Sequence, residues 1–292
     1  MIVKTASPVL LRATLRGGQA FRWREHGDAF VGVLGDRPVL LREHPKGVEM
    51  EGAAPEATVR EYLRLGDPYE RDLEALAADP FLAQAITAYR GLRVLRQDPW
   101  ECLVAFITSA NNNVVRIEGL LDRLSLRAGD RVPSPWGTLR AFPGPEAVAR
   151  LRETTLRSMG YGYRAPYLRE TARRIAGGDL DLAALRTAPY PEAHAALLAL
   201  PGVGPKVADC VCLFSLDKGE AFPVDVWIDR VVSEVYFGGA PLKPREVQAF
   251  ARERWGARAG LAQQFLFHAA RLQGIGAREG RRAPGSGEHR EP

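Results

Sequence analysis

The segment that decides the fold is LPGVGPKVAD, residues 200–209 of the 292-residue chain. An apolar helical run at 193–200 leads into a turn that contains Gly202 and Gly204, and a second helix opens at Pro205. Glycines allow a tight turn that brings backbone N–H groups to the surface. Such amides at a helix start bind anions, and a nucleic-acid phosphate is a natural occupant. The pattern predicts a helix–hairpin–helix that contacts nucleic acid, although an ordinary helical hairpin has the same composition.

Lys206 stands in the first turn of this second helix. Its charge there opposes the positive end of the helix dipole, so the position does not serve helix stability. Beside a phosphate-binding turn, such a lysine is either a phosphate contact or a nucleophile. Asp225 lies further on in FPVDVW, residues 222–227, before another helical run, where we expect it to be the N-cap. A carboxylate fixed at that point also suits the stabilisation of positive charge that develops on a sugar.

Away from the hairpin, the spacing of apolar residues along the chain changes near Pro55. Before it, short runs at 21–24, 29–34 and 38–43 alternate with Gly-bearing turns, which predicts an antiparallel sheet. After it, helical spacing predominates, and Asp98 followed by Pro99 forms a helix start. Further helices are expected around 117–124, 165–175, 244–254 and 260–272.

These patterns predict an α+β fold, in which a small N-terminal antiparallel β-sheet domain packs on a mainly α-helical body that contains the helix–hairpin–helix motif. We expect the sheet domain with its flanking helices at 1–95 and the helical body at 96–277. Residues 278–292 are rich in Gly, Pro, Arg and Glu, without an apolar period, and are expected to be a disordered tail.

Composition limits the function classes. Forty basic and 35 acidic side chains give a net charge of +5, which is compatible with a polyanionic partner without demonstrating one. No apolar stretch reaches the ~18 residues of a membrane span, and the N-terminus does not resemble a secretory signal, so a cytoplasmic protein is expected. Three cysteines without a CxxC pair argue against a disulfide framework, a structural zinc site and a four-cysteine iron–sulfur cluster.

The chain resembles the helix–hairpin–helix DNA glycosylases, and within them the bifunctional 8-oxoguanine DNA glycosylase/AP lyase family of base excision repair. The similar segments follow the family's order over about residues 10–275. They are GQAFRWRE at 18–25, LRQDPWEC at 95–102, SANNN at 109–113, GYGYRA at 160–165, LPGVGPKVADC at 200–210, PVDV at 223–226 and AQQFLF at 262–267. The hairpin alone marks the superfamily, whereas the triple asparagine and the Phe-Arg-Trp segment narrow the resemblance to this family.

The resemblance implies a catalytic pair and a set of DNA contacts. Lys206 would attack the sugar C1′ and form a Schiff base, and β-elimination would then nick the strand, while Asp225 would stabilise the oxocarbenium-like transition state. Gly202 and Gly204 would lie against backbone phosphate, where a structural cation can bridge; no other cofactor or metal is expected. The residues implied to act at the base left unpaired are Asn111, which would fill the gap, Arg116 and Arg164, which would bond to that base, and Tyr163, which would wedge beside it.

For the flipped base, the resemblance implies a pocket. Phe267 and Cys210 would sandwich the base, Gln263 would read its Watson–Crick edge, and the Gly18 carbonyl would accept a hydrogen bond from N7, which carries a hydrogen in 8-oxoguanine and a lone pair in guanine. Two positions depart from the family pattern: Trp227 replaces a common histidine and Ala270 a common aspartate. Their joint change predicts a rearranged pocket wall.

Each of these residues also has a plainer interpretation. Cys210 and Phe267 suit a hydrophobic core, Asn111 suits a helix end, and Gly18 suits a hairpin. Two other functions remain open at this point: a related glycosylase for other oxidised or alkylated bases, and a non-catalytic DNA-binding module, which has no need of Lys206 and Asp225 together. The expected partner is double-stranded DNA that contains 8-oxoguanine, bound by a monomer away from any membrane.

Overall fold

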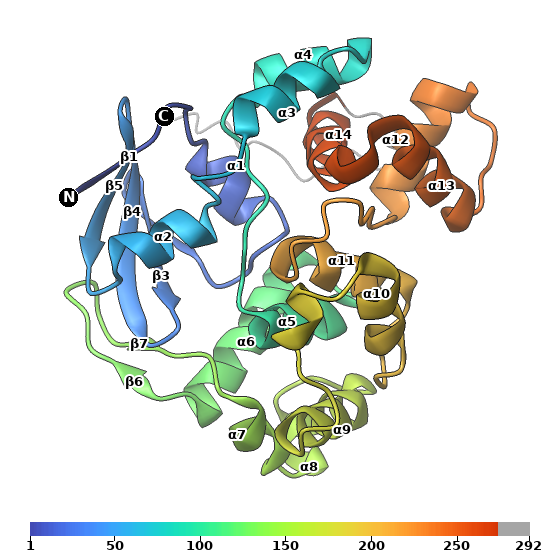
Figure 1. The fold of residues 1–292 in the computed structure, drawn as a ribbon. Coiled ribbons are helices and arrows are strands. Elements are labelled where there is room, and N and C mark those ends of the chain that lie inside the picture. Colours follow the sequence, from blue (N-terminus) through green and yellow to red (C-terminus); the bar gives the residue numbers. More distant parts are fainter. Residues whose placement is uncertain (274–292) are drawn as a thin grey trace, which may run out of the picture.

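The computed structural model describes residues 1–273, with only the backbone for 271–273, and its fold is α+β (Figure 1). A five-stranded antiparallel sheet forms the N-terminal part, in the order β1-β5-β4-β3-β2. Its strands are β1 (Ile2–Lys4), β2 (Arg24–His26), β3 (Ala29–Leu34), β4 (Arg37–His44) and β5 (Gly47–Gly52). The predicted antiparallel sheet is therefore confirmed. The predicted tail at 278–292 lies outside the described residues.

The strand predicted at 21–24 is wrong, because β2 begins only at Arg24. Phe21 and Trp23 are both buried, but in different cores. Phe21 packs edge-on against Phe106 of the helical body, with ring centroids 5.8 Å apart. Trp23 enters the core of the sheet, where its indole N–H donates to the Tyr62 hydroxyl at 2.8 Å. The alternation in the sequence thus marks a segment that connects two cores and does not pair as a strand.

Helices make up most of the remainder. They are α1 (Leu11–Arg16), α2 (Glu56–Tyr62), α3 (Tyr69–Leu76), α4 (Pro80–Ala88), α5 (Pro99–Ser109), α6 (Val114–Ala128), α7 (Pro145–Ala149), α8 (Glu153–Ser158), α9 (Arg164–Ala176), α10 (Tyr190–Leu198), α11 (Pro205–Ser215), α12 (Val226–Phe237), α13 (Pro244–Trp255) and α14 (Ala259–Gln273). A two-stranded ribbon, β6 (Arg131–Val132) with β7 (Leu139–Arg140), follows α6. No helix in the described range is both long and apolar enough to cross a bilayer.

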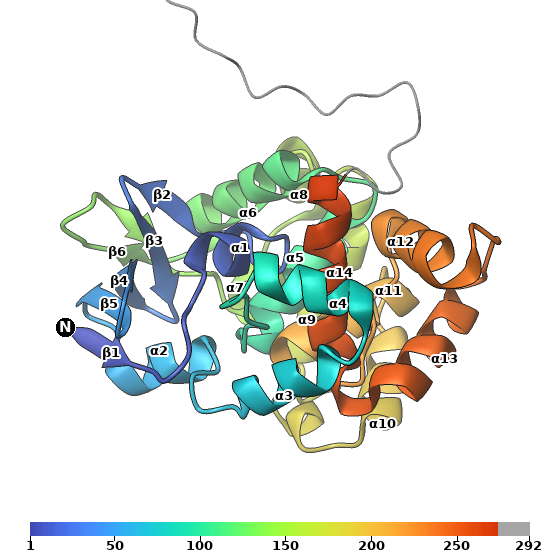
Figure 2. The ribbon, with the colours of Figure 1, turned by 90° about the horizontal axis from the view of Figure 1, so that it is seen from above.

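The hydrophobic interior is organised around three main clusters. One lies under the sheet, and a second joins α5, α6, α9, α10 and α11. A third cluster packs α3 and α4, from the N-terminal third of the chain, on α12, α13 and α14. Figure 2 shows α4 beside α14 in this arrangement. The domain boundary near residue 95 remains a prediction. Helices α3 and α4 lie before this boundary in the sequence but pack on the C-terminal helices.

Helix α5 occupies the centre of the body and packs on α11. It starts as the sequence predicts, with the Asp98 carboxylate accepting from the Glu101 amide at 2.8 Å and Pro99 in the first turn. Residues 102–107 are all buried, which explains why this stretch is apolar on every side. The helix ends at Ser109, and the asparagine triplet follows in the connection to α6.

Candidate active site

A cavity of about 50 Å³ lies where the loop after α1 meets α5, α11, the start of α12 and α14. It brings together all six residues predicted for catalysis and base binding, which are Gly18, Lys206, Cys210, Asp225, Gln263 and Phe267. These residues come from four segments far apart in the sequence. Five further residues complete the wall: Gly17, Phe106, Phe214, Pro223 and Gln264.

Lys206 is the second residue of α11, directly behind the hairpin. Its side chain is half-buried, and its Nζ lies 5.1 Å from the centroid of the Phe106 ring. Phe106 in turn stacks on Phe214, with centroids 5.5 Å apart. The face of an aromatic ring attracts an ammonium group, so the Phe106 ring helps to hold the lysine side chain at the cavity wall.

Cys210 lies one helical turn beyond Lys206 and is almost completely buried. Burial raises the pKa of its thiol to about 12, and the nearby Lys206 charge offsets this only in part. The thiol is therefore neutral at physiological pH. A buried neutral thiol offers a polarisable, nearly apolar surface, which suits contact with a flat ring better than it suits nucleophilic attack.

Asp225 is the N-cap of α12, as the sequence predicts. Its Oδ1 accepts from the backbone amides of Trp227 at 3.0 Å and Ile228 at 2.8 Å. These two bonds fix a half-buried carboxylate at the cavity wall that Lys206 also lines. A negative charge is thereby held in place in the same small cavity as an amine, partly shielded from water.

Gly18 and Phe267 lie close together in the cavity wall. Gly18 has a φ of +92°, and a Cβ placed on it would lie 3.8 Å from the Phe267 ring. The positive φ favours glycine here. The Gln263 amide is buried and engaged within the protein, donating to the Pro223 carbonyl at 3.3 Å and accepting from Gln264 at 2.7 Å. These two bonds orient the Gln263 amide and leave its second N–H and its second oxygen lone pair for a base edge.

The predicted hairpin joins α10 to α11. Gly202 has a φ of +77°, and a Cβ there would come within 2.8 Å of the Tyr167 side chain, so only glycine fits. Gly204 is exposed, and no atom lies within 4 Å of the position that a Cβ would take on it. Both glycines are exposed, so a ligand can reach the hairpin backbone at these two positions, next to the first turn of α11.

A second group of predicted residues gathers at the end of α5. Asn111 has a left-handed φ of +52° and donates to the Tyr163 hydroxyl at 3.0 Å. Arg164 is buried, and its guanidinium donates to the Ala110 carbonyl and lies over the Tyr163 ring, 4.3 Å from its centroid. Arg116 is exposed on the first turn of α6. Asn111, Tyr163 and Arg164 thus form one cluster, in which Arg164 already binds a backbone carbonyl of the protein.

Several cavity residues were not predicted from the sequence. Phe106 lies in a continuous apolar run, where nothing marks the side chain that faces the cavity. Gln264 gives a clearer signal, since it is a second amide directly after Gln263 in a stretch, 259–267, that is otherwise apolar. Trp227 and Ala270, which depart from the family pattern, are not among the described residues that line the cavity, and Ala270 is fully buried against the helices around α12.

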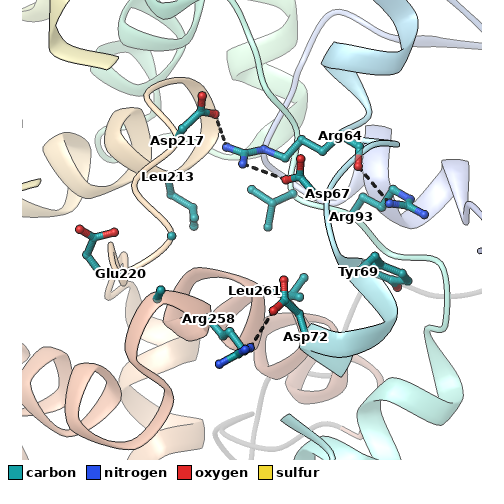
Figure 3. Close-up of a pocket in the computed structure, with 13 residues that line it drawn as sticks. Arg64, Asp67, Tyr69, Asp72, Arg93, Leu213, Asp217, Glu220, Arg258 and Leu261 are labelled. Atoms are coloured by element: carbon teal, nitrogen blue, oxygen red, sulfur yellow. Dashed lines mark hydrogen bonds and ion pairs between the residues drawn. The ribbon is translucent and has the colours of Figure 1, made fainter. Parts of the chain in front are cut away.

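A larger cavity of about 260 Å³ lies elsewhere and contains none of the predicted site residues (Figure 3). Its charged side chains largely pair with one another. Arg64 contacts Asp217 at 2.6 Å and Asp67 at 3.3 Å, and Arg258 contacts Asp72 at 2.7 Å. Within residues 1–273, no group of three or more His, Cys, Asp or Glu side chains is arranged to hold a metal ion.

Comparison with known families divides the chain into two matched parts. Residues 1–103 match the family described as "8-oxoguanine DNA glycosylase, N-terminal domain". Residues 104–257 match the "HhH-GPD superfamily base excision DNA repair protein" family. A probable N-glycosylase/DNA lyase of Methanothermobacter thermautotrophicus is 33% identical over 91% of this chain and 94% of the relative. N-glycosylase/DNA lyase OGG1 of Arabidopsis thaliana is 35% identical over 90% of this chain and 78% of the relative.

Solved structures agree with these matches. The 8-oxoguanine glycosylase/lyase of Clostridium acetobutylicum, bound to double-stranded DNA with cytosine opposite 8-oxoguanine, superposes with a TM-score of 0.88. It is 31% identical and covers 94% of this chain and 99% of its own. A 3-methyladenine DNA glycosylase from Archaeoglobus fulgidus, 22% identical with a TM-score of 0.78, shares the fold. The chain belongs to the 8-oxoguanine DNA glycosylase family, within the HhH-GPD superfamily of base excision DNA repair proteins.

Proposed function

We propose that this bifunctional 8-oxoguanine DNA glycosylase/AP lyase uses Lys206 as its nucleophile and Asp225 as the carboxylate that stabilises the transition state. The observation that carries the proposal is that the two side chains, from the first turn of α11 and the cap of α12, line one cavity together with the residues expected to hold the base. A structural role alone requires Asp225 only as a cap and gives no reason for Lys206 to line the same cavity.

The chemistry follows from this pair. The neutral Lys206 amine attacks C1′ as the bond from C1′ to the base breaks, and the base leaves with the bonding electrons and a proton. Positive charge that develops on the sugar is opposed by the fixed Asp225 carboxylate. Opening of the sugar ring converts the adduct to an imine. Loss of a C2′ proton then expels the 3′ phosphate and cuts the strand, and water finally hydrolyses the imine and returns the amine.

Base recognition requires the nucleotide to leave the duplex, at a cost of a few kcal/mol. We propose that the flipped base stacks between Phe267 and Cys210, with its Watson–Crick edge toward Gln263. The Gly18 carbonyl would accept from N7–H of 8-oxoguanine and repel the N7 lone pair of guanine, a difference of about 1–3 kcal/mol. This difference alone is modest, so the flipping step is expected to contribute to discrimination.

Binding of DNA would involve both clusters. The open backbone at Gly202 and Gly204 suits a phosphate, and a bridging cation held by hairpin carbonyls remains a prediction. Asn111 and Tyr163 are exposed and able to meet the unpaired base, with Arg164 and Arg116 as further donors. Arg164 would either exchange its bond to the Ala110 carbonyl or act by holding Asn111 in position. The expected monomeric state is testable by light scattering on the free protein.

The test is strand cleavage of duplexes that contain 8-oxoguanine opposite each of the four bases. We expect cleavage at the lesion, and none in a duplex with guanine at the same position. Excision of the base without cleavage would contradict the lyase step. Preference for an alkylated base such as 3-methyladenine would instead favour the related glycosylases that share the fold.

A further inference from the structure

We propose that Gln19 is the positioning residue that fixes the Gly18 carbonyl for base recognition, an inference that rests on the role proposed above for Gly18. Gln19 follows Gly18 directly and is completely buried, although glutamine is a polar residue that normally lies at the surface. It does not line the cavity, so it has no contact with the base. Its burial therefore requires another explanation.

The Gln19 side chain uses both of its N–H donors and its carbonyl oxygen. Its Nε2 donates to the backbone carbonyls of Thr14 at 2.9 Å and Arg93 at 2.8 Å, and its Oε1 accepts from the Leu95 amide at 2.8 Å. The Gln19 backbone carbonyl also accepts from the Gln97 side chain at 2.7 Å. Such a set of bonds holds one residue against both the end of α1 and the segment 93–97, and it leaves little freedom at the adjacent peptide.

Gly18 needs such support. Its φ of +92° lies in a region that glycine enters easily but also leaves easily, because it has no side chain to restrict rotation. The direction of its carbonyl therefore depends on its neighbours. Gly17 ends α1 on one side, and Gln19 is tied down on the other. A carbonyl that discriminates through one hydrogen bond must keep its direction when the base arrives.

The segment 93–97 that receives these bonds is itself anchored at both ends. Arg93 lies with its guanidinium over the Tyr69 ring, 4.3 Å from the centroid, and donates to the Arg64 carbonyl at 3.2 Å (Figure 3). At the other end, the backbone N–H of Gln97 donates to the Phe214 carbonyl of α11 at 2.8 Å. The segment 93–97 thus contacts both the residue next to Gly18 and the helix that carries Lys206. Through it, the position of the base is linked to that of the nucleophile.

The experiment separates base recognition from the chemistry at the sugar. Gln19→Met keeps a long buried side chain without the hydrogen bonds, and Gln97→Met removes only the bond to the Gln19 carbonyl. Each is assayed in single turnover on a duplex with 8-oxoguanine and on the same duplex with an abasic site, which needs Lys206 but presents no base to Gly18. Tyr161→Phe is the matched control, since it removes another buried side-chain donor, to the Leu120 carbonyl at 3.1 Å.

We expect Gln19→Met to lower 8-oxoguanine excision by about 10- to 100-fold and Gln97→Met by about 3- to 10-fold. Abasic-site cleavage should stay within about twofold for both, as should both activities of Tyr161→Phe. Parallel loss of both activities, or unchanged excision, would overturn the inference. If Gln19→Met does not fold, Gln97→Met provides the test, by the loss of 8-oxoguanine excision relative to the loss of abasic-site cleavage. Failure of the proposed function is distinguishable, because the wild-type protein would then not excise 8-oxoguanine.

Discussion

The Lys206 side chain lies over the face of the Phe106 ring, with Nζ 5.1 Å from the ring centroid. Phe106 belongs to α5, and it stacks on Phe214, which belongs to the same helix as Lys206. The proposed nucleophile therefore rests on an aromatic pair that joins α5 to α11. Its position depends on how these two buried helices pack, and Asp225 approaches the same cavity from a third element.

Asp225 is expected to act on catalysis more than on folding. Asp225→Asn retains an oxygen that can accept from the Trp227 and Ile228 amides, and asparagine is as good an N-cap as aspartate. The charge that opposes the sugar cation is lost, so single-turnover base excision should fall by about 100-fold or more. Circular dichroism and thermal unfolding should change little. Loss of stability in proportion to activity would instead indicate a purely structural role.

Asn111 is expected to set the preference for the base opposite the lesion. Its side chain is exposed beside the Tyr163 hydroxyl, and Arg164 holds the preceding carbonyl, so Asn111→Ala and Arg164→Ala should both narrow the difference in excision between cytosine and the other three partners. Rates on the four duplexes measure this directly.

Asn113→Ala is the matched control for these variants. Asn113 caps α6 by accepting from the Arg116 amide at 2.9 Å, so its loss should cost about 1 kcal/mol of stability without altering the preference. Equal weakening of Asn111→Ala on all four duplexes would indicate contact with phosphate.

The parts of this molecule that the sequence predicts are those set by local rules. The hairpin glycines, the Asp98 cap and the Asp225 cap each depend on a few neighbouring residues, and all three are found as expected. Phe106 could not be identified in the same way, because every residue from 102 to 107 is apolar and buried. The face that meets Lys206 is decided by packing between helices distant in sequence.

Two other differences have the same origin. The alternating segment from Phe21 to Arg24 has the period of a strand, but Phe21 and Trp23 fill separate cores. That Arg164 meets the unpaired base stays a prediction, but its burial and its bond to the Ala110 carbonyl, which lies 54 positions away, could not be predicted from the sequence. In both cases the deciding contact joins distant parts of the chain.

Asp209 should give folding stability a distinctive pH dependence. It is fully buried on α11, accepting from the Tyr190 hydroxyl at 2.6 Å and the Gln248 amide at 2.5 Å. Burial raises the pKa of Asp209 to about 6, against 3.8 for the free side chain. The folded protein therefore binds this proton more tightly than the unfolded chain. The contribution of Asp209 to stability falls as pH rises from about 4 to about 6 and is constant above that range.

Asp209→Asn cannot titrate and removes this slope. Relative to the wild type, its free energy of unfolding should increase by up to about 3 kcal/mol between pH 4 and pH 6. Denaturant unfolding of both proteins at several pH values measures the difference in their free energies of unfolding. Any stability that Asp209→Asn loses through rearranged hydrogen bonds is the same at every pH. Parallel stability curves for the two proteins would contradict the buried, titrating carboxylate.

Lys206 gives the sharpest test of the chemistry. An amine that attacks C1′ passes through an imine, and borohydride reduces an imine to a permanent bond between protein and DNA. Wild-type protein with an 8-oxoguanine duplex should therefore give a trapped complex on a denaturing gel. Lys206→Gln, similar in length but unable to form the imine, should give none. It should still bind the duplex, because the hairpin backbone and Asn111 are unchanged.

The control for this experiment is Lys46→Gln, which removes an exposed lysine in the turn between β4 and β5 and should trap as the wild type does. Loss of both binding and trapping in Lys206→Gln would make Lys206 a phosphate contact, as in a DNA-binding module without catalysis. Trapping that survives in Lys206→Gln would mean that another amine attacks the sugar. Because Lys206 is the only lysine among the described residues of the cavity wall, surviving trapping would move the reaction away from the site at Asp225.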